Sequence, residues 1–157
     1  MPDEPGQSPV VYLAAPLFTQ AERAWNRALA DRLQRQVGCT VILPQDFGPC
    51  DEAASEESHE AIFRRCLDGV DRCDALIAVL DGADADSGTA FEMGYAHALA
   101  KPLIGLRTDF RQLQDQGANL MLARPCAALV RLTEFGADLD VVAEAVAGAL
   151  VRCLGSG

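Results

Sequence analysis

The sequence predicts an α/β fold built around a five-stranded parallel sheet. Short, wholly apolar runs recur along the chain, as expected for strands that are buried on both faces. Between them lie segments with apolar residues three and four positions apart, as expected for helices. Right-handed crossovers leave few strand orders, and 2-1-3-4-5 is the simplest. We therefore expect a flavodoxin-like three-layer sandwich with that order.

The first half of the chain predicts two strands and two helices. Residues 10–15 are a continuous apolar run, and residues 19–37 follow a helical pattern that Gly38 stops. Residues 40–43 give a second short strand. A loop containing Gly, Pro, Asp and Ser then leads to a second helix over about residues 56–70.

The second half predicts three strands and two helices. Residues 75–80 are the strongest strand of the sequence, and an Asp- and Gly-rich loop leads from them into a helix over about residues 90–100. Residues 102–106 and 126–132 give the last strands, separated by a less regular segment. A helix over residues 139–154 follows.

Length and composition limit the kinds of protein to consider. The 157 residues suffice for one domain, expected over 10–157, after a flexible acidic and Pro-rich tail over 1–9. A net charge of −10 disfavours binding to nucleic acid or to an anionic membrane. Apolar runs fall short of the roughly 20 residues of a membrane helix. The tail lacks the basic region of a signal peptide, so we expect a cytoplasmic protein with reduced thiols.

The cysteine spacing predicts no metal site, because the six cysteines form no CxxC motif and no cluster with the two histidines. A small-molecule ligand is expected instead at the carboxyl ends of the strands, where the strand order reverses. Here that crevice lies between the first and third strands, bordered by residues 12–18 and 81–92. The candidate substrate-binding residues on these borders are Phe18, Asp81, Gly82, Ser87 and Gly88.

Four carboxylates crowd the second border, and two interpretations of them are open. Thr89 and Glu92 have the spacing of a capping box, and the aspartates favour turns, so the segment could serve only to start a helix. Alternatively, Glu92 lies in the first turn of that helix, where the helix N-terminus favours its ionised form. An ionised carboxylate at a ligand crevice can attack an electrophilic carbon, as retaining glycosyl transfer requires.

The segment Asp86-Ser87-Gly88-Thr89-Ala90-Phe91-Glu92-Met93-Gly94-Tyr95-Ala96, followed by Ala100-Lys101-Pro102, resembles the hallmark of the nucleoside 2-deoxyribosyltransferase family. The opening residues 11–18 are similar to the first strand and sugar-side loop of that family. Asn119-Leu120-Met121 is similar to its late segment, which in the family reaches into the neighbouring subunit's site. The resemblance covers roughly residues 10–125.

The resemblance implies that Glu92 attacks C1′ of a 2′-deoxynucleoside, expels the base and passes the sugar to another nucleobase or to water. It implies no metal or organic cofactor, a place in nucleotide salvage, and a homodimer or larger homo-oligomer. Asp86 would lie near the sugar and base, and Tyr12 would position Glu92. Gln45 would contact the base, and Asn119, with Met121 beside it, would complete a neighbouring protomer's site.

One position departs from the family pattern. The family commonly has an aspartate eight residues before the residue that here is Asp74, and this chain has Cys66 there. A neutral thiol is a poor general acid for a leaving base, and we expect Cys66 to serve as a core residue. Two other functions therefore stay open: hydrolysis of nucleoside 5′-monophosphates, which Asp86 disfavours by repelling phosphate, and a non-catalytic nucleoside- or nucleotide-sensing module.

Overall fold

The computed structural model describes residues 8–48, 55–111 and 118–155. The predicted sheet is confirmed: its five strands have the order β2-β1-β3-β4-β5, and every neighbouring pair is parallel. The strands are β1 Val10–Ala14, β2 Thr40–Ile42, β3 Ala75–Val79, β4 Leu103–Arg107 and β5 Ala128–Arg131. The expected tail and the loop after β2 lie partly outside the described residues.

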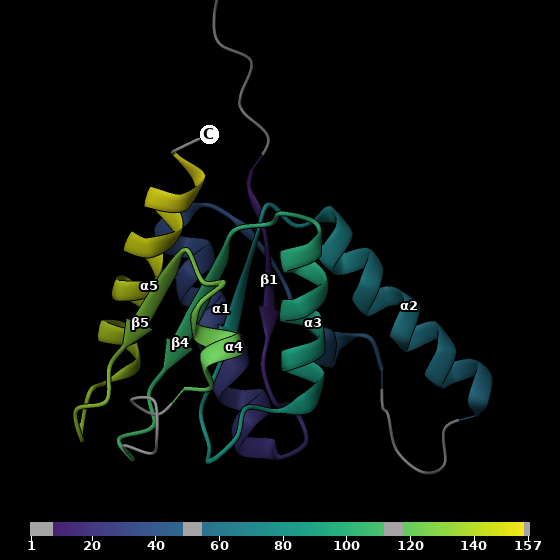
Figure 1. Ribbon diagram of the computed structural model, residues 1–157, viewed down its shortest axis with the longest axis horizontal. Helices are drawn as coiled ribbons and strands as arrows, with labels where there is room; N and C mark the ends of the chain where they lie inside the picture. The colour runs from purple at the N-terminus through teal and green to yellow at the C-terminus, as the bar shows by residue number, and fades with distance from the viewer. Residues whose placement is uncertain (1–7, 49–54, 112–117, 156–157) are drawn as a thin grey trace, which may run out of the picture.

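Helices cover both faces of the sheet. The helices are α1 Gln20–Val37, α2 Glu56–Arg72, α3 Ser87–Ala98, α4 Leu120–Ala123 and α5 Leu139–Leu154, with a 3₁₀ turn η1 at Pro44–Asp46. Figure 1 shows α2, α3 and α4 in front of the sheet and α1 and α5 behind it. Each face has its own apolar core, because the central strands β1, β3 and β4 present buried side chains to both sides.

The first long helix begins and ends at strong local signals. Thr19 and Glu22 form a reciprocal capping box at the start of α1. Gly38 ends the helix with φ 72°, a left-handed conformation that favours glycine. The expected start and stop of this helix are therefore confirmed.

The start of α3 differs from the expectation. Helix α3 begins at Ser87 rather than near Ala90, because the Asp86 carboxylate accepts a hydrogen bond from the Thr89 amide and acts as the N-cap. The prediction of a capping box between Thr89 and Glu92 is therefore wrong, and Glu92 lies in the second turn of α3. Helix α4 was not expected, since only four residues follow its Asn119 cap.

Two general features of the described ranges bear on function. No helix there is long and apolar enough to cross a bilayer. Within the same ranges, no three His, Cys, Asp or Glu side chains gather in a group that would hold a metal ion. The five cysteines described form no disulfide.

Candidate active site

The centre of the site is a hydrogen bond between β1 and α3. Tyr12 is fully buried on the face covered by α2 and α3, and its hydroxyl donates to Oε1 of Glu92 at 2.6 Å. Glu92 is partly buried, and its carboxylate is held by a neutral donor rather than by a cation. The structure thus brings together the two residues that the sequence proposed as nucleophile and positioning group.

Cys66 is the third member of this cluster. It lies on α2, is half-buried, and its side chain is hydrogen-bonded to both Tyr12 and Glu92. The expectation that Cys66 is a core residue is therefore wrong. The sequence did offer one indication of a role in the site: Cys66 stands eight residues before Asp74. The family that the sequence resembles commonly has an aspartate at that position.

A glycine on α2 makes room for this arrangement. A Cβ on Gly69 would lie 2.7 Å from Cε2 and 3.0 Å from Cδ2 of Tyr12. Helix α2 can therefore approach β1 closely only because residue 69 has no side chain. The same approach carries Cys66, one turn earlier, toward the Tyr12 hydroxyl.

Burial dominates the electrostatics of the cluster. Removal from water raises the pKa of Glu92 to about 7, and the nearby charge of Asp86 adds to the rise, while hydrogen bonds from Tyr12 and Cys66 oppose it. Burial, with the negative charge of Glu92, also raises the pKa of the Tyr12 phenol far above its ordinary value. The expected stabilisation of ionised Glu92 by a helix N-terminus is wrong, because Glu92 lies in the second turn and is desolvated.

The segment before Glu92 also has a structural role, because Asp86 caps α3. Oδ2 of Asp86 accepts from the amide of Thr89 at 2.9 Å and from its hydroxyl at 3.2 Å. Ser87 and Gly88 are the first two residues of α3 and are exposed. The other oxygen of Asp86 has no such bond to the helix, so the residue can cap α3 and still present an acceptor to a ligand.

Asp81 and Gly82 take part in hydrogen bonds that join the loop after β3 to the loop after β4. The Asp81 carboxylate accepts from the amides of Thr108 at 2.6 Å and Asp109 at 3.0 Å, and also from the Thr108 hydroxyl. The Gly82 amide donates to Asp109 at 3.0 Å. Buried Arg107, which the sequence did not single out, donates to the Gly82 carbonyl at 3.3 Å. The structure thus uses these polar groups to shape the edge of the site.

Gln45 and Phe18 lie at the opposite border. The Gln45 amide donates to the carbonyl of Arg23 at 3.0 Å and accepts from buried Asn26 at 3.2 Å, so α1 holds its side chain. Asn26, which the sequence reading missed, also donates to the carbonyl of Pro16 at 3.0 Å and fixes the loop after β1. Phe18 is 70% exposed on that loop and is available to a ligand.

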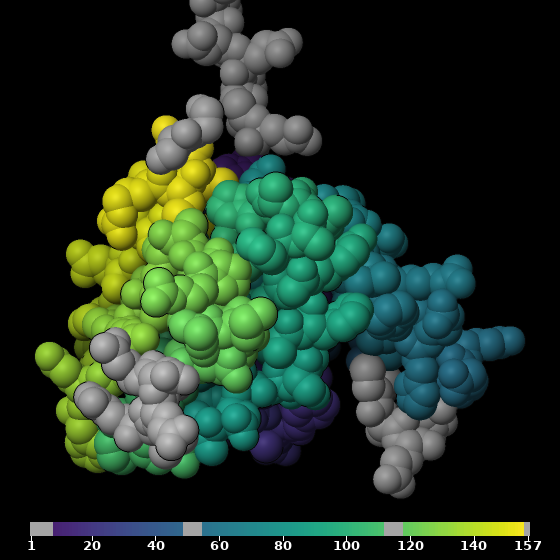
Figure 2. Space-filling view, in the orientation of Figure 1, coloured from purple at the N-terminus to yellow at the C-terminus, as the bar shows by residue number. Residues whose placement is uncertain are grey.

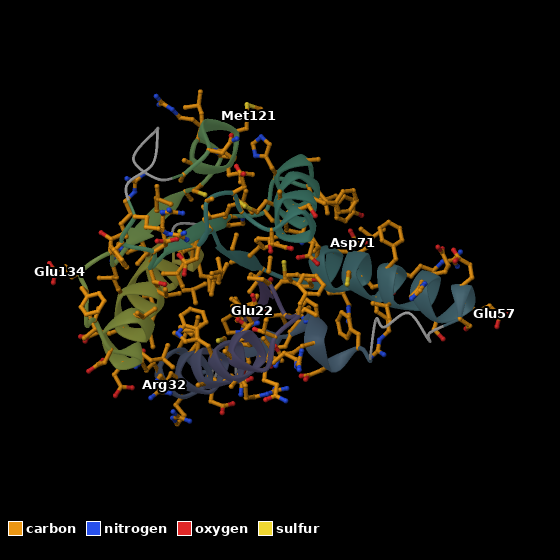
Figure 3. The ribbon with its side chains drawn as sticks, turned by 90° about the horizontal axis from the view of Figure 1, so that it is seen from below. Glu22, Arg32, Glu57, Asp71, Met121 and Glu134 are labelled. Atoms are coloured by element: carbon orange, nitrogen blue, oxygen red, sulfur yellow. The ribbon has the colours of Figure 1, made fainter. Side chains whose placement is uncertain are left out.

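Asn119 and Met121 face solvent on α4. The Asn119 side chain caps the helix by accepting from the Met121 amide at 2.9 Å. Met121 is 78% exposed, and Figure 3 shows it pointing outward on the side of the sheet opposite Arg32 of α1. In Figure 2, α4 lies on the front surface next to α3. Leu120, 52% exposed, adds to the apolar surface there.

An aromatic pair joins the two helices that carry Cys66 and Glu92. The rings of Phe63 on α2 and Phe91 on α3 lie 6.1 Å apart and are about half exposed. Phe63 precedes Cys66 by about one helical turn, and Phe91 is next to Glu92. Nothing in the periodicity of either helix distinguished these rings from ordinary core residues.

Comparisons with known proteins point to one enzyme family. A family model described as nucleoside 2-deoxyribosyltransferase matches residues 11–145. A nucleoside deoxyribosyltransferase from Limosilactobacillus fermentum is 28% identical over 142 residues, 84% of each chain. The structure of a 2-deoxyribosyltransferase from Bacillus psychrosaccharolyticus is similar with a TM-score of 0.63 at 25% identity, covering 83% of this chain and 95% of that one. A CMP N-glycosidase from Clostridium botulinum, at 19% identity, TM-score 0.57 and coverage of 90% and 97%, shares the fold.

Proposed function

The chain belongs to the nucleoside 2-deoxyribosyltransferase family, and we propose that it cleaves the N-glycosidic bond of 2′-deoxynucleosides through a covalent deoxyribosyl–Glu92 intermediate. Members of this family are glycosyltransferases or N-glycosidases that act on nucleosides. The observation that carries the assignment of Glu92 is the Tyr12 hydroxyl 2.6 Å from its carboxylate. That bond fixes Oε1 of the carboxylate and so orients the nucleophile.

The proposed reaction has two displacements at one carbon. An oxygen of ionised Glu92 attacks C1′, the bond from C1′ to the base nitrogen breaks, and its electron pair leaves with the base. A second base or a water molecule then attacks C1′, and the pair of the ester bond returns to Glu92. Two inversions give net retention. The raised pKa of Glu92, about 7, makes its carboxylate a stronger nucleophile than an ordinary one whenever it is ionised.

The other candidate residues receive roles by their place around this pair. Asp86 accepts from the sugar with the oxygen that α3 does not use, and Ser87 and Gly88 offer exposed groups beside it. Phe18 covers the base, and Gln45 contacts the base from the 3₁₀ turn η1. Asp81 and Gly82 border the substrate from the loop after β3, whose position their hydrogen bonds fix.

The proposed active form is a homo-oligomer in which α4 of one protomer completes the site of another. Asn119 would bind the sugar hydroxyls there, and the exposed side chains of Leu120 and Met121 would be covered by the partner. We further propose that residues 10–157 act as one domain that works in nucleotide salvage in the cytoplasm, a reducing compartment. In keeping with this, the five cysteines that the structure describes form no disulfide.

Trapping of the intermediate tests the nucleophile. The protein is mixed with a 2′-deoxynucleoside, quenched in acid within seconds, digested and examined by mass spectrometry. We expect one deoxyribosyl group on the peptide containing Glu92. Glu92→Ala should release no base and carry no label. Glu92→Gln, which keeps the shape but not the charge, should also be inactive with a melting temperature no lower than that of the wild type, since it removes a partly buried charge. Unchanged turnover in folded Glu92→Ala would contradict the assignment.

A binding module without catalysis is the second candidate, and the thiol of Cys66 beside Glu92 is the observation that favours it. A chromatographic assay separates the candidates. Deoxyinosine, deoxyadenosine, deoxyuridine and their 5′-monophosphates are each incubated with and without a second base. A new nucleoside supports transfer, free base alone supports hydrolysis, and release from monophosphates alone supports the monophosphate hydrolase. Binding of a nucleoside without any release supports the module.

A further inference from the structure

Two loops at the carboxyl ends of β1 and β2 border the place proposed for the base, and α1 holds both of them. Residues 16–18 follow β1, and the 3₁₀ turn η1 follows β2, the strand next to β1 in the sheet. Arg23 of α1 donates to the carbonyls of Leu17 at 2.8 Å and Phe18 at 2.9 Å. A second residue of the same helix, Asn26, joins the two loops to each other.

Asn26 is a buried polar residue, only 4% exposed, and it serves both loops through one nitrogen. Its Nδ2 donates to the carbonyl of Pro16 at 3.0 Å and to Oε1 of Gln45 at 3.2 Å. Because an amide nitrogen carries two hydrogens, it can satisfy both acceptors at once. The loop after β1 and the Gln45 side chain are therefore held to one point on α1.

The orientation of the Gln45 amide follows from its partners. The backbone carbonyls of Pro16 and Arg23 can only accept, so the amide atom that faces each of them is a nitrogen. The Pro16 carbonyl makes Nδ2 of Asn26 the donor, and Gln45 must then turn its oxygen toward Asn26. Independently, the Arg23 carbonyl requires Nε2 of Gln45 on its side, at 3.0 Å. A flip of Gln45 would therefore set nitrogen against nitrogen at one end of the amide and oxygen against oxygen at the other.

A glutamine in a fixed orientation can distinguish the donors and acceptors of a base. An amide that turns freely offers a donor or an acceptor at the same point and so suits bases of either kind. In Gln45, Oε1 already accepts from Asn26, whereas Nε2 has a second hydrogen besides the one that it gives to Arg23. A hydrogen that a bound base shields from water needs an acceptor, and an amino group there would place two donors against each other.

We infer that this chain favours nucleosides whose base carries a carbonyl oxygen over those with an amino group at the same position, and that Asn26 is the positioning residue for this choice. The inference rests on the proposed function, in which Gln45 contacts the base, and deepens it by naming the class of base. Asn26 acts through Gln45: it keeps Nε2, rather than Oε1, toward the base.

Two pairs of 2′-deoxynucleosides test the choice, because each pair exchanges a carbonyl for an amino group. Deoxyinosine and deoxyadenosine differ in this way at C6 of a purine, and deoxyuridine and deoxycytidine at C4 of a pyrimidine. We measure kcat/KM for base release and form the carbonyl-to-amino ratio within each pair. Gln45→Met, which has no amide, gives the ratio that the reactivity of the nucleosides alone produces. For the wild type we expect ratios at least about tenfold above this reference, the worth of one unpaired donor.

Asn26→Leu should free the Gln45 amide with little change in side-chain volume. We expect both ratios to fall at least halfway, on a logarithmic scale, to those of Gln45→Met, since only the Arg23 carbonyl then orients the amide. Leu33→Val is the matched control. Leu33 is buried in the core about two turns further along α1, so this variant should lose stability and keep the wild-type ratios. Asn26→Ala takes the place of Asn26→Leu if the latter does not fold.

The outcomes separate this inference from the proposed function. Base release with wild-type ratios equal to those of Gln45→Met, or below them, would overturn the inference and leave the proposed function standing. Wild-type ratios in a folded Asn26 variant would overturn the role of Asn26. No release from any nucleoside, with Glu92 unlabelled, would overturn the proposed function itself. In that case the dissociation constants of the same four nucleosides, measured by calorimetry for the wild type and the variants, decide the choice of base.

Discussion

Tyr12 and Glu92 are 80 positions apart in the sequence, and one hydrogen bond between them defines the reactive centre. The expected strand order put both residues on the borders of one crevice, and the family resemblance implied that Tyr12 would position Glu92. The sequence could not give the ionisation state of Glu92. Position along the helix suggested an easily ionised carboxylate, whereas burial, which depends on the packing of α2 against β1, raises its pKa to about 7.

The raised pKa predicts a pH dependence. The proposed nucleophile must be ionised, so kcat/KM should reach its maximum well above pH 7 and should fall as the pH drops through about 7. The hydrogen bond from Tyr12 lowers this pKa, so Tyr12→Phe should move the fall to higher pH. It should also lower kcat/KM by about ten- to a hundredfold, the worth of one hydrogen bond to a charged group. pH profiles of base release check this, and an unshifted profile in the variant would contradict it.

At the scale of elements, the contact of α2 with β1 sets the geometry. The sequence predicted both segments from their apolar patterns. It did not predict how closely they approach, because that depends on which residue of α2 faces the Tyr12 ring. Gly69 occupies that place, and its lack of a side chain is visible in the sequence only as a helix-weakening residue.

Gly69→Ala should therefore destabilise the protein. In a helix, alanine ordinarily gains up to about 1 kcal/mol over glycine, but here its Cβ would lie 2.7 Å from a buried ring. Overpacking of this kind costs about 1–3 kcal/mol. Gly94→Ala in α3 is the matched control, since nothing lies within 4 Å of its Cβ, and it should stabilise. Urea unfolding of both variants measures the difference, and equal stabilisation would contradict the packing argument.

Prediction was also uneven among elements. The five strands and four long helices follow from runs and periods that short stretches of sequence contain. The start of α3 was missed by three residues, because Asp86 and Thr89 are both good caps and only the folded chain shows which one is used. The ties from Arg107 and Asp109 were invisible, since they join loops that become neighbours only when β3 and β4 pair.

At the scale of the whole molecule, the described chain leaves Leu120 and Met121 of α4 exposed, while the proposed nucleophile Glu92 lies on α3. The proposed oligomer would resolve both facts at once, because α4 would be covered and would also contribute Asn119 to a second site. A site shared between protomers has a distinctive consequence for mixtures of inactive variants.

Mixed variants test the shared site. Glu92→Ala and Asn119→Ala should each be inactive alone. Unfolded together and refolded as a mixture, they should recover up to about a quarter of the wild-type activity, since half of random dimers are mixed and each has one intact site. Light scattering gives the oligomeric state, and Leu120→Ser with Met121→Ser should favour the monomer. No recovery from mixed oligomers would place Asn119 in its own protomer's site or in none.

The hydrogen bonds between the loops after β3 and β4 have a consequence for ligand binding. Asp81, Arg107 and Asp109 fix the backbone at that edge by bonds within the chain itself. The conformational entropy of this edge is therefore lost when the protein folds, and an arriving nucleoside does not have to order it. More of the energy of contact with the sugar is left for holding the reacting atoms in line, so bonds between two loops give a chain of modest size a preorganised edge for its ligand.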